Sequence, residues 1–85
     1  MRLTQTLPMS EAIHLERCDS SRNIARFYRL ELGQTLFGEV MLIRRWGRIG
    51  TQGRVFQSVM ESQTDGERSL QHWHQKKRRR GYRSM

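Results

Sequence analysis

The chain has 85 residues, enough for one small domain but not for a second domain or an enclosed cofactor cavity. Its 16 basic and 8 acidic residues give a formal net charge of +8, and only 35% of residues are hydrophobic, which predicts a small core beneath a charged exterior. The single cysteine, Cys18, excludes an internal disulfide framework and fits a reduced thiol, so we expect a cytoplasmic protein. No apolar run has the length of a signal peptide or a membrane span.

Excess positive charge is confined to the second half of the chain. Residues 1–43 carry five basic and five acidic residues, whereas residues 44–54 contain four arginines and no acidic residue. Residues 65–85 add seven basic and two acidic residues. Two basic blocks on one small domain predict an anionic partner: nucleic acid first, then an anionic membrane, then an acidic protein surface.

Apolar patterning predicts an antiparallel sheet in the first two thirds of the chain. Residues 1–11 are polar and irregular and read as a flexible arm. Alternating or apolar runs then predict strands at 12–18, 24–32, 36–46 and 54–63, with a turn at 19–23. The third strand is apolar on both faces, which places it in the centre of the sheet. Short connections favour an antiparallel meander.

One helix is predicted to follow the sheet. Thr64 and Glu67 have the spacing of a capping box, and Gly81 is suited to end a helix that runs to about Arg79. Leu70, Trp73 and the stem of Lys77 would form its narrow apolar stripe. We therefore expect an α+β fold, with four to five meander-like strands packed against one C-terminal helix. The domain should span residues 12–83, leaving 84–85 as a tail.

Residues 44–54 combine four arginines with one tryptophan and three glycines. A planar ring among cations suits a phosphate-rich ligand with a flat face, but Trp46 could also simply cap the end of the core. Strand alternation places Arg44 and Trp46 on one face and Arg45 on the other. Gly47, Gly50 and Gly53 are interpreted as turn residues with positive φ. No Gly-Lys-Ser/Thr follows them, so they do not form a nucleotide-binding P-loop.

Catalytic and metal-binding patterns are not found in the sequence. His72 and His74 would lie about 200° apart around a helix, and His14 is distant in sequence, so a zinc site is not expected. No paired carboxylates, Ser-His-Asp set or activated nucleophile is evident. We expect no enzyme activity, no metal, no cofactor and no small-molecule substrate.

Three segments resemble the WGR domain, a family named for its tryptophan-glycine-arginine tripeptide. Residues 26–32 resemble the family's basic-aromatic-aromatic strand, and residues 45–53 resemble its signature. Lys76 or Lys77 followed by Gly81-Tyr82 resembles its C-terminal ending. The resemblance covers about residues 12–83. It implies an antiparallel sheet with one helix and no catalysis of its own. In DNA-dependent poly(ADP-ribose) polymerases, this domain helps bind DNA at strand breaks and relays that binding to neighbouring domains.

The resemblance assigns roles to particular residues. Trp46 becomes a platform that stacks on the sugar of a nucleotide at a broken end. Arg48 becomes a phosphate or interdomain contact, and Tyr82 a hydroxyl donor to a terminal phosphate. Some relatives use an asparagine on phosphate where this chain has Ala25, and the nearest asparagine here, Asn23, lies two residues earlier. No polymerase domain lies within these residues, so any relay would act on a separate protein.

The sequence thus predicts a non-catalytic nucleic-acid-binding module that binds DNA ends or nicks through stacking and phosphate contacts. The alternative is a protein-interaction module that docks an acidic partner surface. RNA is a further candidate that the sequence does not separate from DNA. The predicted contact residues are Arg44, Arg45, Trp46, Gly47, Arg48, Arg54, Lys76, Lys77 and Tyr82. Within the run 76–80 we expect two or three cations to face the ligand, with secondary contributions from Arg68, Gln75 and Arg79.

Overall fold

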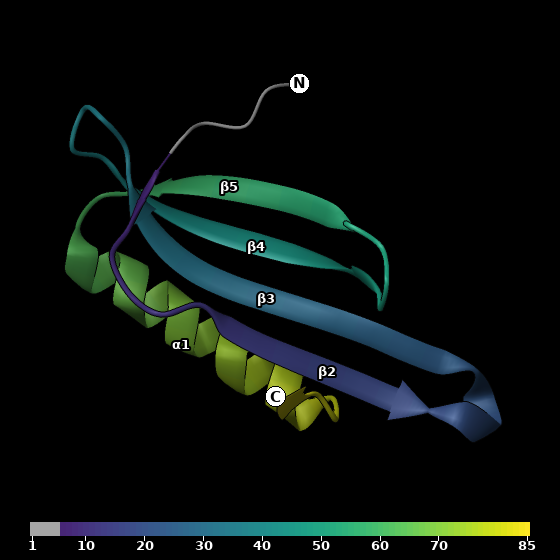
Figure 1. Ribbon diagram of the computed structural model, residues 1–85. Helices are drawn as coiled ribbons and strands as arrows, with labels where there is room; N and C mark the ends of the chain where they lie inside the picture. The colour runs from purple at the N-terminus through teal and green to yellow at the C-terminus, as the bar shows by residue number, and fades with distance from the viewer. Residues whose placement is uncertain (1–5) are drawn as a thin grey trace.

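A computed structural model describes residues 6–85 as one antiparallel sheet with a single helix against one face (Figure 1). The strands are β1 (Leu7–Pro8), β2 (Ile13–Asp19), β3 (Ile24–Gln34), β4 (Val40–Arg48), β5 (Arg54–Met60) and β6 (Arg83–Ser84), and the helix is α1 (Gln63–Arg79). The sheet order is β5-β4-β3-β2-β6, with β1 paired to β3. Strands β2 to β5 are consecutive neighbours, so the predicted α+β fold and meander are confirmed.

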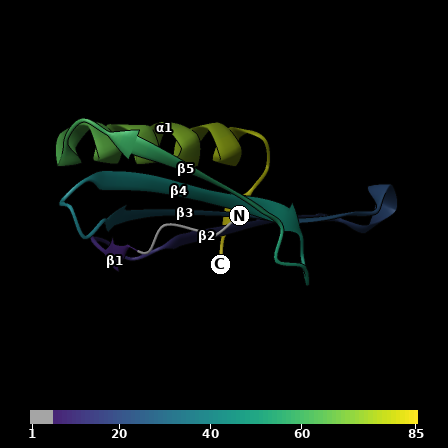
Figure 2. The ribbon, with the colours of Figure 1, turned by 90° about the horizontal axis from the view of Figure 1, so that it is seen from above.

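Strand register assigns alternate residues to two faces of the sheet. Tyr28 on β3 lies opposite Trp46 on β4, and Leu30 lies opposite Arg44. Helix α1 covers this side, which we call the helix face, and among residues 6–85 no α-helix covers the other side, the open face (Figure 2). The core between sheet and helix consists of Leu15, Tyr28, Leu30, Leu32, Val40, Leu42, Leu70 and Tyr82. Its most buried members, Leu15 and Leu30, are fully enclosed.

Both ends of α1 are set by local hydrogen bonds. The N-cap is Ser62, whose hydroxyl oxygen accepts a 3.1 Å hydrogen bond from the backbone N–H of Asp65. The predicted capping box at Thr64 is therefore wrong, because the helix begins one residue before it. At the other end Gly81 adopts a φ of 95°, and the N–H of Tyr82 donates to the carbonyl of Lys77. This reversal turns Tyr82 back into the core.

Residues 36–39 form a loop, not the start of the third strand as the sequence predicted. The buried hydroxyl of Thr35 accepts hydrogen bonds from the N–H groups of Phe37 and Glu39. Gly38, with a φ of 85°, completes the turn. Leu36 and Phe37 consequently extend into solvent, and β4 begins only at Val40. The apolar pattern did not distinguish an exposed loop from a buried strand.

Short pairings extend the sheet at both ends of the described chain. Leu7 and Pro8 pair with Gln34 and Gly33, although the sequence placed them in an irregular arm. Arg83 and Ser84 pair with β2, where a tail had been expected at residue 84. The rest of the predicted arm, residues 1–5, lies outside the described residues. Within residues 6–85, no helix combines the length and apolar character required to cross a bilayer.

Candidate nucleic-acid interface

A pocket of about 490 Å³ opens on the helix face, beside the C-terminal end of α1. Strands β3 and β4 supply its floor, and the end of α1 with the following residues supplies one wall. The pocket is lined by Arg26, Tyr28, Trp46, Gly47, Arg48, Lys77 and Tyr82. It therefore brings together residues from both basic blocks of the sequence around a group of aromatic rings.

Three aromatic rings form the centre of this helix-face pocket. The rings of Tyr28 and Trp46 are nearly parallel, with centroids 5.9 Å apart and planes inclined by 16°. Tyr82 meets Tyr28 edge-on, with centroids 6.3 Å apart. Tyr28 and Tyr82 are buried, whereas Trp46 is only partly buried. Trp46 thus packs against the core and also keeps part of its indole exposed in the pocket.

Arg44 is enclosed by aromatic side chains on the same face. Its guanidinium carbon lies 4.0 Å from the ring centroid of Trp73 and 5.0 Å from that of Phe56. Its Nη1 donates a 3.1 Å hydrogen bond to the hydroxyl oxygen of Tyr28. Burial raises the pKa of Tyr28, and the hydrogen bond from Arg44 opposes that rise. Arg44 therefore stabilises the packing of these aromatic side chains in addition to adding positive charge.

Lys77 carries uncompensated charge at the pocket wall. Its Nζ lies 4.6 Å from the ring centroid of Tyr28 and 5.6 Å from that of Tyr82. Partial burial lowers the pKa of Lys77, and neighbouring cations lower it further, chiefly Arg80. Within residues 6–85 the only ion pairs within 4.0 Å are on the open face, so no carboxylate pairs with this cation cluster. An anion entering the pocket would supply the missing counter-charge.

Asn23 positions the side chain of Arg48. It adopts a left-handed conformation, with a φ of 54°, at the end of a 3-10 turn formed by Ser20–Arg22. Arg48 Nη2 donates to Asn23 Oδ1 over 3.3 Å, and Arg48 Nη1 approaches the Asn23 carbonyl oxygen at 3.5 Å. Asn23 thus orients the signature arginine toward the extended β2–β3 hairpin. The sequence did not predict this supporting role for Asn23.

Arg26 is a pocket residue that the sequence analysis did not select. It lies opposite Arg48 in the register of β3 and β4 and lines the pocket with it. Strand alternation could have identified it, because Arg26 is two residues before Tyr28 and must share its face. Two arginines placed opposite one another on adjacent strands repel, and this repulsion favours an anion between them.

Gly47 and Gly53 allow the signature turn to close tightly. A Cβ atom on Gly47 would lie 2.7 Å from the Cα of Gly53, and one on Gly53 would lie 2.2 Å from the Trp46 carbonyl oxygen. Gly50 and Gly53 have positive φ values, as predicted, but Gly47 does not. The prediction of a positive φ at Gly47 is wrong, because this residue belongs to β4 and is needed for close packing.

The remaining predicted contact residues do not all meet at this pocket. Arg54 is exposed on β5, opposite Trp46, and Lys76 Nζ lies 4.9 Å from the Trp73 ring centroid. Arg45 lies on the open face, as alternation predicted, where its Nη1 donates to the carbonyl of Gln52 over 3.2 Å. Among residues 6–85, no three His, Cys, Asp or Glu side chains are grouped to hold a metal ion.

Comparison with known proteins found related sequences. The family model of the WGR domain matches residues 11–85. The chain is also 41% identical over 71 residues to the "Uncharacterized protein y4dW" of Sinorhizobium fredii, a match that covers 84% of this chain and 35% of that relative. The chain therefore spans about a third of the relative's length. No solved structure matches the chain significantly.

WGR domains are modules of a nucleic-acid-binding type and are typically non-catalytic. The matched range contains every residue of the helix-face pocket. With its sheet, its single helix and its Trp46-Gly47-Arg48 tripeptide at the end of β4, the chain belongs to the WGR domain family.

Proposed function

We propose that this WGR domain is a non-catalytic module that binds DNA at ends or nicks through the helix-face pocket. The observation that carries the proposal is a partly exposed indole in an open pocket whose cations have no carboxylate partner among residues 6–85. Trp46 would stack on an exposed nucleotide, while Arg26, Arg48 and Lys77 would neutralise its phosphates.

The position of Trp46 favours broken over intact duplex. Tyr28 already packs along one side of the indole, so a ligand has access only to the remaining exposed part. In an intact duplex, neighbouring stacked nucleotides restrict such access, whereas an end or a nick frees a terminal sugar and base. The pocket offers a stacking ring and cations, which suit the face of a nucleotide and its phosphates and carry no readout of base edges. Binding should therefore depend little on sequence and strongly on salt.

Tyr82 is largely buried but still lines the helix-face pocket. The residue is buried yet lines the pocket beside Lys77, so the ligand would meet only its accessible edge. The resemblance gives it the role of a hydroxyl donor to a terminal phosphate, and we retain that role as part of the proposal. A Tyr82→Phe substitution would test it, because the ring packing is kept and only the hydroxyl is removed.

A second candidate function is docking to an acidic protein surface. It uses the same uncompensated cations but does not require Trp46 to contact the ligand. The domain would then show little affinity for DNA at physiological salt. An intracellular site of action, which the unpaired and exposed Cys18 suits, is common to both candidates.

A gel-shift series can separate the two functions. The substrates would be a nicked duplex, a blunt duplex, a closed circle, a single strand and a nicked RNA duplex, each at several salt concentrations. We expect the nicked and blunt DNA to bind tightest, and Trp46→Ala to weaken that binding about 5- to 100-fold, as loss of one stacking contact does. The matched control is Trp46→Phe, which keeps a ring. Equal binding of the closed circle, or unchanged binding by a folded Trp46→Ala variant, would contradict the proposal.

A further inference from the structure

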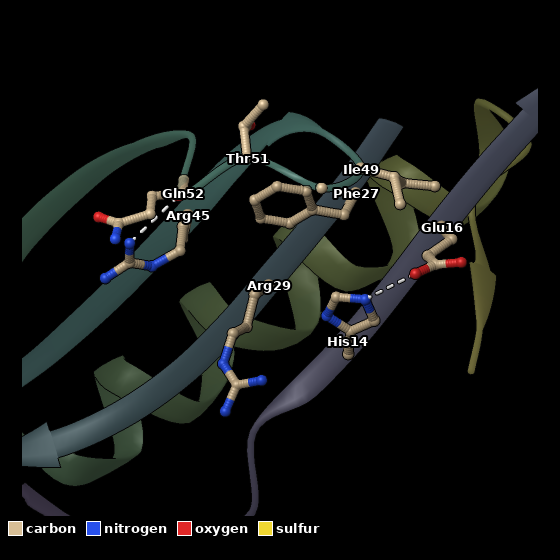
Figure 3. Close-up of a pocket in the computed structure, with 9 residues that line it drawn as sticks. His14, Glu16, Phe27, Arg29, Arg45, Ile49, Thr51 and Gln52 are labelled. Atoms are coloured by element: carbon tan, nitrogen blue, oxygen red, sulfur yellow. Dashed lines mark hydrogen bonds and ion pairs between the residues drawn. The ribbon is translucent and has the colours of Figure 1, made fainter. Parts of the chain in front are cut away.

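A row of nitrogen-bearing side chains crosses the open face, outside the site described above. His14 on β2 pairs with Arg29 on β3, which in turn pairs with Arg45 on β4. Figure 3 shows the three side chains from neighbouring strands around one hollow. Like charges directly opposite each other destabilise a sheet, and Glu31, with Oε1 4.0 Å from Arg29 Nε, offsets the repulsion between Arg29 and Arg45 only in part.

These side chains border a pocket of about 270 Å³ on the open face. Phe27 and Ile49 give the pocket an apolar part, and the ring of His14 stacks on that of Phe27 with centroids 5.9 Å apart. Thr51 and Gln52 of the signature turn form another part of the rim (Figure 3). The pocket thus combines a small apolar surface with two guanidinium groups, as sites for small charged ligands commonly do.

Both guanidinium groups keep donors for a ligand. Arg45 is held in place by one hydrogen bond from Nη1 to the Gln52 carbonyl, which leaves its remaining N–H groups for other acceptors. Arg29 Nε lies 4.0 Å from Glu31 Oε1, too far for a hydrogen bond. Neither arginine is therefore fully paired within the described part of the chain, and Arg45 has a fixed orientation.

We propose that this open-face pocket is a second anion site, which binds the phosphate group of a nucleotide. A phosphate has one more acceptor oxygen and more negative charge than a carboxylate, so it matches the two guanidinium groups better. The nucleoside would lie along Phe27 and Ile49. Glu16, bonded to His14 over 3.1 Å, repels a second acidic group but can accept from a base amino group or a sugar hydroxyl.

A free mononucleotide and one unit of a strand present the same chemistry to this site, and the titrations below distinguish them. The site stands apart from the Trp46 pocket, because Arg45 and Trp46 point to opposite faces of β4. The inference therefore does not depend on the proposed function, and either can fail alone.

Nuclear magnetic resonance of the full ¹⁵N-labelled chain tests the site directly. The Nε–H signals of Arg29 and Arg45 and the backbone signals of residues 49–52 would be followed during titration with adenosine monophosphate. Inorganic phosphate, a short oligothymidylate and a glutamate-rich peptide form parallel titrations. We expect the mononucleotide to shift these signals at millimolar concentration or below, and more strongly than phosphate or the peptide. Tighter binding of the oligonucleotide would identify a strand as the source, and equal or weaker binding a free nucleotide.

Substitutions provide the matched controls. Arg45→Gln should weaken mononucleotide binding at the open face at least tenfold, while Arg68→Gln, the same charge change at an exposed position of α1, should alter it less than twofold. Trp46→Ala should leave the open-face titration intact, which separates this site from the helix-face pocket. The backbone spectrum shows whether each variant is folded. Unmoved signals at Arg29 and Arg45, a stronger response to the peptide, or unchanged affinity in Arg45→Gln would overturn the proposal.

Discussion

Arg44 and Arg45 are neighbours in sequence, but they have opposite surroundings. Arg44 lies on the helix face, enclosed by the rings of Trp73, Phe56 and Trp46 and bonded to the hydroxyl of Tyr28. Arg45 lies on the open face, held by one loop carbonyl and facing the like charge of Arg29. Successive basic residues on a strand therefore point to opposite faces of the sheet, and the role of each depends on the face that it occupies.

We interpret this difference as one between charge that stabilises the fold and charge that is proposed to bind a ligand. On the helix face, Arg44 stabilises the aromatic group, while Arg26, Arg48 and Lys77 surround the pocket without carboxylate partners among residues 6–85. On the open face, Arg45 makes one hydrogen bond to the Gln52 carbonyl and keeps its other donors for the proposed ligand. Removing the charge of Arg44 should consequently lower the stability of the fold, whereas removing the charge of Arg45 should weaken ligand binding.

The largest effect is expected where the turn joins the two faces. Gly53→Ala should lower the free energy of unfolding by more than about 3 kcal/mol, because its φ of 71° is unfavourable and its Cβ would overlap the Trp46 carbonyl oxygen. Gly50→Ala is the control: its φ of 96° is also unfavourable, but nothing lies within 4 Å of the new Cβ, so the loss should be about 1–2 kcal/mol. Urea unfolding measures both, and equal losses would contradict the tight packing of this turn.

Arg44→Gln and Arg45→Gln compare the two faces at identical charge change. We expect Arg44→Gln to lower stability by about 1–2 kcal/mol, because it removes the cation–π contacts and leaves the Tyr28 hydroxyl without its partner. Arg45→Gln should change stability by less than about 0.5 kcal/mol, or raise it slightly, since repulsion with Arg29 is relieved. Thermal or urea unfolding is the measurement. A greater loss for Arg45→Gln would reverse the assignment of roles.

Arg48→Gln tests the ligand-binding charge of the helix face. The logarithm of the DNA-binding constant should fall less steeply with the logarithm of salt concentration, with the slope reduced by about 1, because one phosphate contact is lost. Arg68→Gln, at an exposed α1 position that does not line the pocket, should change the slope less, because Arg68 is expected to make only a secondary contribution. Fluorescence anisotropy with nicked duplex gives both slopes, and identical slopes would remove Arg48 from the interface.

Lys77 gives the smallest and most local effect. Burial and neighbouring cations hold its pKa below the ordinary value of 10.5. Between that lowered pKa and 10.5 the unfolded chain binds more protons at this site than the folded one, so the contribution of Lys77 to stability rises with pH across that window. A bound phosphate should move the pKa upward. Titration of the Lys77 side-chain signals by NMR, with and without nicked DNA, would show the rise, whereas a pKa unaffected by DNA would place Lys77 away from the phosphate.

The sequence predicted the fold class and the separation of Arg44 and Trp46 from Arg45, because both follow from local alternation. It placed the helix start at Thr64, since Thr64 and Ser62 each precede a suitable acidic residue and local patterns do not choose between them. It missed the loop at 36–39, because apolar side chains there face solvent and are not buried.

Local sequence patterns could not predict the two pockets, because each pocket is formed by residues that are distant in sequence. The enclosure of Arg44 depends on Phe56 and Trp73, which are distant in sequence and meet only when β5 and α1 pack together. The open-face row of His14, Arg29 and Arg45 depends on the register of three strands. Arg26 could have been found from its alternation with Tyr28, because residues two apart on a strand share a face.

The central claim is that Trp46 contacts an exposed nucleotide, and its fluorescence tests this most directly. In a Trp73→Phe variant, Trp46 is the remaining tryptophan of the chain. Nicked or blunt duplex should quench its emission and protect it from acrylamide, whereas closed circular DNA should do neither. Emission and acrylamide access that stay unchanged while the nicked duplex is bound would contradict the account.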